Sequence, residues 1–537
     1  MRNEDLLNRS ALTDFLLKTS SYPHHPKNVV HIQTHASDVF IASPYVYKVK
    51  KPVDFGFLDF TTLERRKYFL EQELLLNRRL TSGIYLEVLE ISLQDGQCGF
   101  GPGEKTIEYA LLMKEMPEKY FLKTLLKEGK TSKKNFENIA LKLARFYKSE
   151  LPDPRVSAYG EPESIQLSVD ESTTLSRKFI GETISEAAFN ALEYYNKRFF
   201  DTRSHLFRQR VEGGFIKDCH GDLHLEHVNI SPQGINIYDC IEFNERFRYI
   251  DIASDTGFLA MDLDFNGYYD YSRYFISRVS EAMEDSGLYR VLDFYKCYRA
   301  YVRGKVESIK AFETEVPSKM REIARERAQK YFKLALRYAL LGSRPSLIVT
   351  CGSIGTGKST LANKLSMELS CQVISSDTLR KQKVGAKPGE KHFEEYESGI
   401  YSKEITRDIY EELAARGTRI VNSGECAVLD ASFSKHKWRE LIRRSASKYN
   451  IPVLFIHTTA PMKIVRERLL KRELEGESIS DGRLEILERF AREYEEPVEV
   501  GKDSPITVDT TERKETQLSA LFKQLVQINL ERKYEYG

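Results

Sequence analysis

The sequence predicts a multidomain protein of mixed α/β and α+β class, with separate units joined along one chain. The chain has 537 residues, more than one hydrophobic core normally organises, so we expect two or three domains. Residues 346–369 read as a buried strand, a glycine-rich loop and a helix, which is the local order of a parallel α/β unit. Residues 29–50 instead form three short alternating runs, which are typical of an antiparallel sheet.

Composition and charge narrow the class of partner. The formal net charge is +2, so the chain has no strong positive electrostatic field of the kind that attracts nucleic acid. A nucleic-acid partner is therefore possible but not favoured. The seven cysteines are scattered without metal-type spacing, as expected of reduced thiols in a cytoplasmic protein. The first residues lack the apolar core of a signal peptide, and no apolar run could span a bilayer, so we expect no membrane partner.

The glycine-rich loop carries the clearest chemical signal. It matches the phosphate-binding pattern G-x-x-x-x-G-K-[ST] at every fixed position, and a glycine-rich turn without a ligand is the alternative. The glycines let backbone N–H groups turn inward around an anion, and the following helix adds its positive end. We expect Lys358 to reach the β- and γ-phosphates of ATP or another nucleotide, and the Ser359 hydroxyl to hold Mg²⁺. The predicted nucleotide-binding residues are Gly352, Ser353, Ile354, Gly355, Thr356, Gly357, Lys358, Ser359 and Thr360.

A candidate acceptor site follows the next predicted strand, residues 372–375. Ligands gather at the carboxyl ends of parallel strands, and Asp377 follows this strand directly. We expect Asp377 to accept the proton of a substrate hydroxyl and Arg380 to hold an anionic group of the same substrate. The alternative is an N-cap aspartate beside a surface arginine.

Two more strands are predicted in this unit, at residues 419–421 and 427–430. Asp430 ends the second, and we expect it to orient Mg²⁺ through water. A later helix carries Arg468 and Arg472, which are four residues apart and share a face.

These two arginines, followed by a predicted lid at residues 480–483, would neutralise charge on the γ-phosphate in the transition state. A solvated basic helix is the alternative.

The N-terminal runs predict a nucleotide-binding lobe. In such a lobe a strand lysine touches the phosphates of the nucleotide and a helix carboxylate holds that lysine. The lysine is expected to be Lys48, with Lys50 as the second choice. The carboxylate is expected to be Glu73 on a helix over residues 62–80, with Glu71 second; a solvated lysine and a surface helix are the alternative.

A second, mostly helical region contains an acidic segment that suits phosphoryl transfer. One carboxylate must accept a proton from the attacking hydroxyl, and another must hold Mg²⁺ against the transferring phosphate. We expect Asp222 to be the first and Asp239, after a tight turn, to be the second. A structural ion-binding turn is the alternative reading.

His220-Gly221-Asp222, together with Asp239, resembles the catalytic segment of aminoglycoside phosphotransferase-type kinases, which have a bilobal protein-kinase-like fold. The resemblance spans about residues 30–310 and favours Lys48 and Glu73 as the phosphate-binding pair. It also matches Asp251 to the aspartate that follows the metal-binding one. Asp251 is expected to line a pocket for a cationic or polyhydroxy acceptor, or else to favour a helix N-terminus.

One position departs from that family. The family has asparagine five residues after the catalytic aspartate, where this chain has His227, with Asn229 two residues on. Neutral histidine is a poor ligand for Mg²⁺, which prefers oxygen. Either Asn229 takes the metal-binding place, or the metal site is altered, or the domain is weakened.

The C-terminal unit resembles small P-loop kinases of metabolites, such as gluconate and shikimate kinases. Asp377-x-x-Arg380 is equally similar to phage-type polynucleotide 5′-kinases and zeta-toxin kinases. The order of the units resembles bacterial bifunctional proteins that join an aminoglycoside phosphotransferase-like domain to an ATP-binding, AAA-type domain. The predicted division is a first lobe at residues 1–115, a second lobe at 116–312, a helical linker at 313–344 and a P-loop kinase domain at 345–537.

These expectations describe an enzyme with two kinase sites, each acting on a small-molecule hydroxyl acceptor with ATP and Mg²⁺. The alternative is a P-loop kinase or ATPase, with a polynucleotide 5′-kinase as one form, whose N-terminal unit binds a ligand and regulates.

Overall fold

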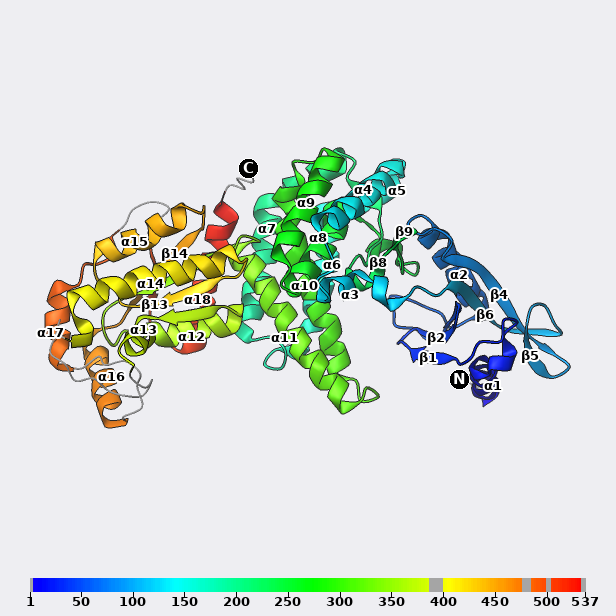
Figure 1. The fold of residues 1–537 in the computed structure, drawn as a ribbon, viewed down its shortest axis with the longest axis horizontal. Helices are drawn as coiled ribbons and strands as arrows, with labels where there is room; N and C mark the ends of the chain where they lie inside the picture. The colour runs from blue at the N-terminus through cyan, green and yellow to red at the C-terminus, as the bar shows by residue number, and fades with distance from the viewer. Residues whose placement is uncertain (1–2, 386–398, 476–483, 499–503, 533–537) are drawn as a thin grey trace. The chain divides into compact units, whose positions relative to one another are not determined.

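The computed structural model describes residues 3–385, 399–475, 484–498 and 504–532 (Figure 1). The chain packs into two compact units, each with its own sheet. Unit 1 comprises residues 1–165, 206–264 and 271–288, and unit 2 comprises residues 166–205, 265–270 and 289–537. Across the described ranges, no helix combines the length and the apolarity needed to cross a membrane.

Unit 1 begins with helix α1 (Asn3–Leu17) and an antiparallel six-stranded sheet of order β1-β2-β3-β6-β4-β5. The strands predicted in this region are confirmed, and β5, which closes a tight hairpin with β4, was not expected. The strands are β1 (Val30–Gln33), β2 (Ser37–Ala42), β3 (Tyr45–Lys50), β4 (Tyr85–Gln94), β5 (Gln97–Phe100) and β6 (Lys105–Lys114).

Helix α2 (Leu63–Arg78) links β3 to β4 and carries the expected carboxylate. It begins where the Thr62 hydroxyl accepts a hydrogen bond from the backbone N–H of Arg65, which satisfies one of the open donors of the first turn. Its apolar face packs on the sheet through Leu70, which clusters with Leu111 of β6. This packing holds one face of α2 over the central strands.

The remainder of unit 1 is mainly helical, with two short strand pairs that shape the catalytic segment. β7 (Ile216–Asp218) pairs with β10 (Tyr249–Asp251), and β8 (Val228–Ser231) forms a hairpin with β9 (Gly234–Ile237). In chain order the helices before the second large sheet are α3 (Leu122–Lys127), α4 (Lys133–Ser149), α5 (Pro154–Ser157), α6 (Pro162–Ser176), α7 (Glu186–Glu212), α8 (Ile252–Phe265), α9 (Tyr269–Met283), α10 (Leu288–Phe312) and α11 (Ser318–Leu341). Of these, α11 and most of α6, α7 and α10 fall within the bounds of unit 2.

Unit 2 contains a parallel five-stranded sheet of order β12-β13-β11-β14-β15, which confirms the predicted α/β class. Its strands are β11 (Leu347–Cys351), β12 (Gln372–Ser375), β13 (Ala427–Asp430), β14 (Val453–Thr459) and β15 (Ile506–Asp509). Its further helices are α12 (Lys358–Leu369), α13 (Ser376–Lys383), α14 (Lys403–Asn422), α15 (His436–Ser447), α16 (Met462–Glu475), α17 (Leu484–Glu493) and α18 (Lys514–Glu531).

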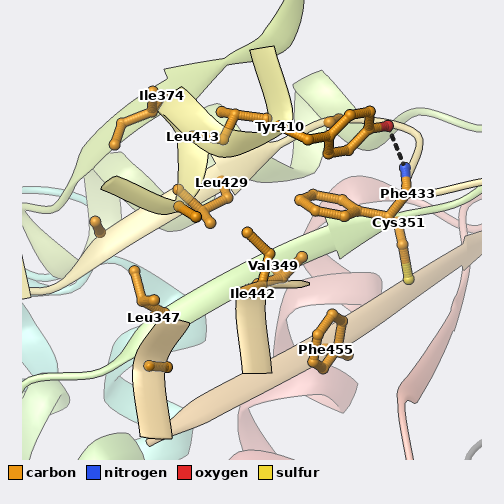
Figure 2. Packing of buried hydrophobic residues seen from close by; sticks show 14 of the residues in the cluster. Leu347, Val349, Cys351, Ile374, Tyr410, Leu413, Leu429, Phe433, Ile442 and Phe455 are labelled. Carbon is orange, nitrogen blue, oxygen red and sulfur yellow. Dashed lines mark hydrogen bonds between the residues drawn. The ribbon is translucent and has the colours of Figure 1, made fainter. Parts of the chain in front are cut away.

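The core of unit 2 surrounds its central strands (Figure 2). All five residues of β11 are buried, as expected for a strand covered on both faces. Leu429 of β13 packs beside them, and the Tyr410 hydroxyl accepts a hydrogen bond from the backbone N–H of Phe433 at 3.1 Å. This contact fixes the chain just after β13, close to the candidate site.

The predicted strand at residues 419–421 is wrong, because this run lies in the last turns of α14. Its β-branched residues favour a strand locally, but the buried positions of α14 recur at helical spacing through Leu413, Ala414, Gly417 and Val421. Ser423 ends the helix, with its backbone N–H bonded to three preceding carbonyls. Tertiary burial of one helix face therefore overrides local propensity.

Truncation of Ile442, a fully buried member of this core, should destabilise unit 2. We expect Ile442→Ala to lower the free energy of unfolding by about 2–5 kcal/mol, because it removes apolar contacts and leaves a cavity. Denaturant titration followed by fluorescence of Trp438, the single tryptophan, would measure the change, since Trp438 packs on the same cluster. Met367→Ala, at an exposed position, should shift the value by no more than about 0.5 kcal/mol.

Candidate active sites

Two strand lysines of unit 1 share one buried carboxylate. The ammonium group of Lys48 lies 2.7 Å from Glu73 Oε1 and 2.9 Å from Asp239 Oδ1. Lys50, two residues along β3 and therefore on the same face, lies 2.9 Å from Glu73 Oε2 and also donates to Glu242. The side chain of Glu73 is fully buried, so its charge depends on both lysines. Glu71, the second choice, lies on the exposed side of α2.

The charges of this network determine the protonation of its members. Burial alone would lower the pKa of Lys48, but the carboxylates of Asp239 and Glu73 raise it well above its ordinary value. Burial would raise the pKa of Glu73, but Lys48 and Lys50 lower it. The network therefore holds a charged lysine against two charged carboxylates.

Asp239 reaches the network because its backbone adopts an unusual conformation. Its φ angle is +61°, a left-handed value that aspartate tolerates better than most residues. Its backbone N–H donates to the Tyr85 hydroxyl at 3.2 Å, which secures this conformation two residues beyond β9. Burial opposes ionisation of Asp239, but Lys48 and His227 hold its pKa far below the ordinary range.

The segment around Asp222 is anchored by a buried carboxylate on α8. Asp255 accepts backbone N–H bonds from His220 at 3.1 Å and from Gly221 at 2.9 Å, and a hydroxyl bond from Tyr147 at 2.8 Å. Gly221 has a φ of +85°, and a Cβ atom there would lie 2.7 Å from the Phe247 carbonyl oxygen. Only glycine fits this turn, which directs the next residue, the candidate base, outward.

Asp262 of α8 holds the next part of the same loop, since it accepts the backbone N–H of Leu225 at 3.0 Å. From the sequence, both Asp255 and Asp262 were expected to line an acceptor pocket, and neither was expected to position this loop. A signal was present: the two aspartates are seven residues apart, so they lie on the same face of a helix. Both act as positioning residues for the catalytic segment.

Two histidine side chains lie beside the candidate base. His224 Nε2 lies 3.4 Å and His227 Nδ1 lies 3.5 Å from Asp222 Oδ2. His227 Nδ1 is also 2.9 Å from the Asp222 carbonyl oxygen, and its Nε2 is 3.5 Å from Asp239 Oδ2. His227 thus bridges the two aspartates that the sequence analysis assigned to base and metal. A mixed nitrogen and oxygen donor set of this kind does not suit hard Mg²⁺.

Asn229 lies two residues further on, in β8. It pairs across the hairpin with Asn236, and its side-chain nitrogen is buried without a hydrogen-bond partner. His227, at the position where the family has asparagine, lies beside the candidate metal-binding aspartate, with its Nε2 3.5 Å from Asp239 Oδ2.

Asp251 is placed differently from the expectation that it faces an acceptor. Its two carboxylate oxygens accept hydrogen bonds from the Arg210 guanidinium at 2.8 and 2.9 Å, and the same arginine binds Asp285 at 2.6 Å. All three side chains are buried. Asp251 therefore neutralises a buried arginine and fixes the start of α8 rather than lining an open pocket.

In unit 2 the glycine-rich loop runs from β11 into α12 as predicted. Gly352, Gly355 and Gly357 have φ angles of +145°, +77° and +91°. A Cβ atom on Gly352 would lie 2.6 Å from the Thr458 carbonyl oxygen, so the loop approaches β14 too closely for any other residue. The backbone is thereby turned at the N-terminus of α12, the arrangement that binds phosphate.

Polar side chains meet beside this loop. The ammonium group of Lys358 donates to the Ser353 carbonyl oxygen at 2.7 Å, within the loop itself. Asp430, at the end of β13, accepts a bond from the Thr350 hydroxyl of the neighbouring strand at 3.3 Å. Carboxylate and hydroxyl oxygens are the donors that Mg²⁺ prefers, so Asp430 and Ser359 fit that ion.

A cleft of about 1050 Å³ lies at the same sheet edge. Ser359, Asp377 and Asp430 all line it, so the candidate base and the candidate magnesium ligands share one space. Arg380 does not line it. The Arg380 guanidinium instead bonds the Thr406 hydroxyl at 3.1 Å and lies over the ring of Tyr401.

The arginines that line the described part of the cleft are Arg416 and Arg419 of α14, and neither was assigned a role from the sequence. Arg419 was missed because residues 419–421 were predicted to form a strand.

Arg468 lies against the glycine-rich loop rather than in open solvent. Its guanidinium donates to the Thr510 carbonyl at 2.6 Å and hydroxyl at 2.9 Å, and to the Gly355 carbonyl at 3.4 Å. It therefore braces the loop. Arg472 lies on the same helix, α16, and the predicted lid at residues 480–483 lies outside the described residues.

Fold and sites define a protein that joins a kinase-like unit to a P-loop domain. Residues 347–497 match the family described as AAA domain. Proteins of Mycobacterium tuberculosis strain H37Rv and of Mycobacterium bovis, both described as uncharacterized, are 28% identical over 445 residues, which cover 82% of this chain and 85% of each relative. Both units therefore have counterparts in these relatives.

Two solved kinases are among the structures similar to this chain. The GDP complex of aminoglycoside 2'-phosphotransferase-IIIa is 12% identical and covers 59% of this chain and 98% of its own, with a TM-score of 0.39. A gluconokinase from Sinorhizobium meliloti is 20% identical and covers 35% of this chain and 92% of its own, with a TM-score of 0.24. Likeness at this level assigns no substrate, so the chemistry must come from the residues above.

The largely buried histidine beside Asp239 should make unit 1 sensitive to acid. Burial, with a contribution from His224, lowers the pKa of His227 from 6.5 to about 4. Between these values the unfolded chain binds a proton that the folded unit does not, so stability is complete above pH 6.5 and falls toward pH 4. We expect a loss of at most about 3 kcal/mol.

Amide exchange of the β8–β9 hairpin, measured near neutral pH and at about pH 4.5, would detect this loss. His227→Asn should remove most of the pH dependence, whereas His25→Asn, at an exposed position of unit 1, should leave it unchanged. An undiminished pH dependence in His227→Asn would contradict the assignment.

Proposed function

We propose that the protein is an ATP-dependent phosphotransferase with two kinase sites, each moving a γ-phosphoryl group to a hydroxyl of a small polyhydroxy or aminoglycoside-like acceptor. The observation that carries the proposal is the cleft of unit 2, which Ser359, Asp377 and Asp430 line together beside a phosphate-binding loop. Phosphoryl transfer needs a bound phosphate chain, a metal site and a proton acceptor within one space.

In the proposed reaction of unit 2, the loop amides and Lys358 bind the phosphates of the nucleotide. Ser359 and Asp430 would hold Mg²⁺, which supplies positive charge to the β- and γ-phosphates when bound. Asp377 orients the acceptor hydroxyl and takes its proton as the oxygen attacks phosphorus. Arg468 keeps the loop in its binding shape through its bonds to Gly355 and Thr510.

In the proposed reaction of unit 1, Lys48 binds nucleotide phosphates while Glu73 and Asp239 hold its ammonium group. Asp222 takes the proton of the acceptor hydroxyl, with its loop held by Asp255. The order of strand lysine, helix carboxylate, base and metal aspartate supports this reading.

A specific observation favours a second possibility for unit 1. His227 beside Asp239 alters the donor set from oxygen to mixed nitrogen and oxygen. A unit altered in this way could bind a ligand and regulate unit 2 without transferring phosphate. Measuring nucleotide binding by the Lys358→Ala chain, in which unit 1 is left as the nucleotide site, separates the enzymatic and the regulatory readings of unit 1. Metal-dependent binding favours the enzyme. No binding favours a regulatory module that uses no nucleotide.

Removing each candidate base should separate the two activities. We expect Asp377→Asn to lower transfer at unit 2, and Asp222→Asn to lower transfer at unit 1, by roughly 10²–10⁴-fold, because each loses general-base catalysis. Labelled ATP and a panel of sugars, aminoglycosides, nucleosides and oligonucleotides would provide the assay. Asp95→Asn, in the exposed β4–β5 turn, is the matched control and should keep both activities.

If neither base substitution changes transfer to any acceptor, the two-site proposal fails. Labelling confined to a 5′-hydroxyl oligonucleotide would replace the small acceptor with a polynucleotide end.

The charges of the unit 2 cleft favour an acceptor that carries an anionic group as well as hydroxyls. Arg416 and Arg419 of α14 line the cleft with Asp377, and Arg416 is already paired with Glu412 at 2.5 Å. We expect Arg419→Ala to raise the KM for such an acceptor about tenfold with little change in the KM for ATP, because it removes a charged hydrogen bond. Steady-state kinetics with each substrate varied would measure both constants, and an equal rise in both would contradict this role.

A further inference from the structure

The three histidines of the catalytic segment use their ring nitrogens in a fixed pattern. His220 Nδ1 accepts the backbone N–H of Asp222 at 3.3 Å, so its Nε2 carries the hydrogen that binds the Tyr238 carbonyl oxygen at 2.8 Å. His224 Nδ1 accepts the backbone N–H of Glu226 at 3.3 Å. The neutral ring has one donor and one acceptor nitrogen, so His224 Nε2 carries the hydrogen that points toward Asp222.

His227 has the opposite pattern. Its Nδ1 lies 2.9 Å from the Asp222 carbonyl oxygen, which can only accept, so Nδ1 carries the hydrogen. Its Nε2 therefore presents a lone pair, 3.5 Å from Asp239 Oδ2. The other oxygen of Asp239 is bonded to Lys48 at 2.9 Å. Two acceptors that face each other repel unless a cation lies between them, and the Asp239 side chain, which is 40% exposed, leaves a path for an ion to enter.

The separation suits a bound ion. Transition-metal ions bind imidazole nitrogen and carboxylate oxygen at about 2.0–2.2 Å, so two ligands 3.5 Å apart can contact one ion. The Nδ1–H bond of His227 to a backbone carbonyl is the outer contact that metal-binding histidines normally make.

Another grouping lies nearby but is less suitable. Ligand atoms of Asp222, His224 and His227 all lie within 4.8 Å of one another. In that set His224 would have to lose its Nε2 hydrogen while Nδ1 still accepts from Glu226, and ligation through His227 Nδ1 would break its bond to the carbonyl of residue 222. The pair of His227 and Asp239 needs neither change.

We propose that unit 1 binds a first-row transition-metal ion that accepts imidazole nitrogen, rather than Mg²⁺, through His227 Nε2 and Asp239 Oδ2. Imidazole is a ligand for such ions, whereas Mg²⁺ requires oxygen donors and dehydrates reluctantly. The inference deepens the proposed kinase function of unit 1, but metal binding itself requires no phosphoryl transfer.

Pulsed electron paramagnetic resonance of Mn²⁺ bound to the full chain tests the proposal, because it detects coupling to an imidazole nitrogen. The wild-type chain should show this coupling. His227→Asn should abolish it and weaken Mn²⁺ binding at this site about tenfold or more, since a ligand is lost. His224→Asn should retain the coupling, because His224 donates its hydrogen and is not a ligand. His227→Gln serves as a second variant if circular dichroism shows that His227→Asn does not fold.

No nitrogen coupling in the wild-type chain, or coupling that persists in both His227 variants, would overturn the proposal. Coupling lost in His224→Asn would assign the ion to the other grouping and overturn the ligand assignment. Assays of phosphoryl transfer on the same samples keep the two questions apart: coupling without transfer refutes only the kinase function of unit 1, and transfer without coupling refutes only the metal site.

Discussion

A lysine ammonium group that is removed from water must be surrounded by oxygen acceptors that replace its lost hydration. Both candidate sites depend on this requirement. In unit 1 the acceptor is Glu73, which is itself fully buried and is stable as an anion only because Lys48 and Lys50 face its two oxygens. The sheet supplies both lysines from alternate positions of β3, and α2 supplies the carboxylate. The lobe therefore cannot lose one member of this network without leaving an unpaired buried charge.

Both units also bring one backbone segment close to another, and positive φ angles make this possible. Gly352 passes so near β14 that no Cβ atom fits, and Gly221 does the same beside Phe247. Asp239 adopts a left-handed conformation with a side chain, held by its bond to Tyr85. A strained backbone conformation persists only where surrounding contacts hold it in place. At Asp239 this conformation places the carboxylate beside Lys48.

Local patterns predicted much of both sites, and tertiary contacts determined the rest. The loop at Gly352 and the order of Lys48 and Glu73 follow from motif and periodicity, which are visible in one dimension. The role of Asp251 could not be predicted, because its partner Arg210 lies 41 residues earlier in the chain. The helical state of Arg419 was missed because three β-branched or charged residues predict a strand when the buried face of the whole helix is not considered.

The histidine beside Asp239 connects the chemistry of unit 1 with its stability. Replacing an amide by an imidazole removes an oxygen ligand but adds a ring whose Nδ1–H can be fixed by the backbone of Asp222. The same bond that would orient His227 as a ligand also holds the base-bearing loop at residue 222. A metal at this position would thus order the loop that carries Asp222, so ion binding and positioning of the candidate base depend on one side chain.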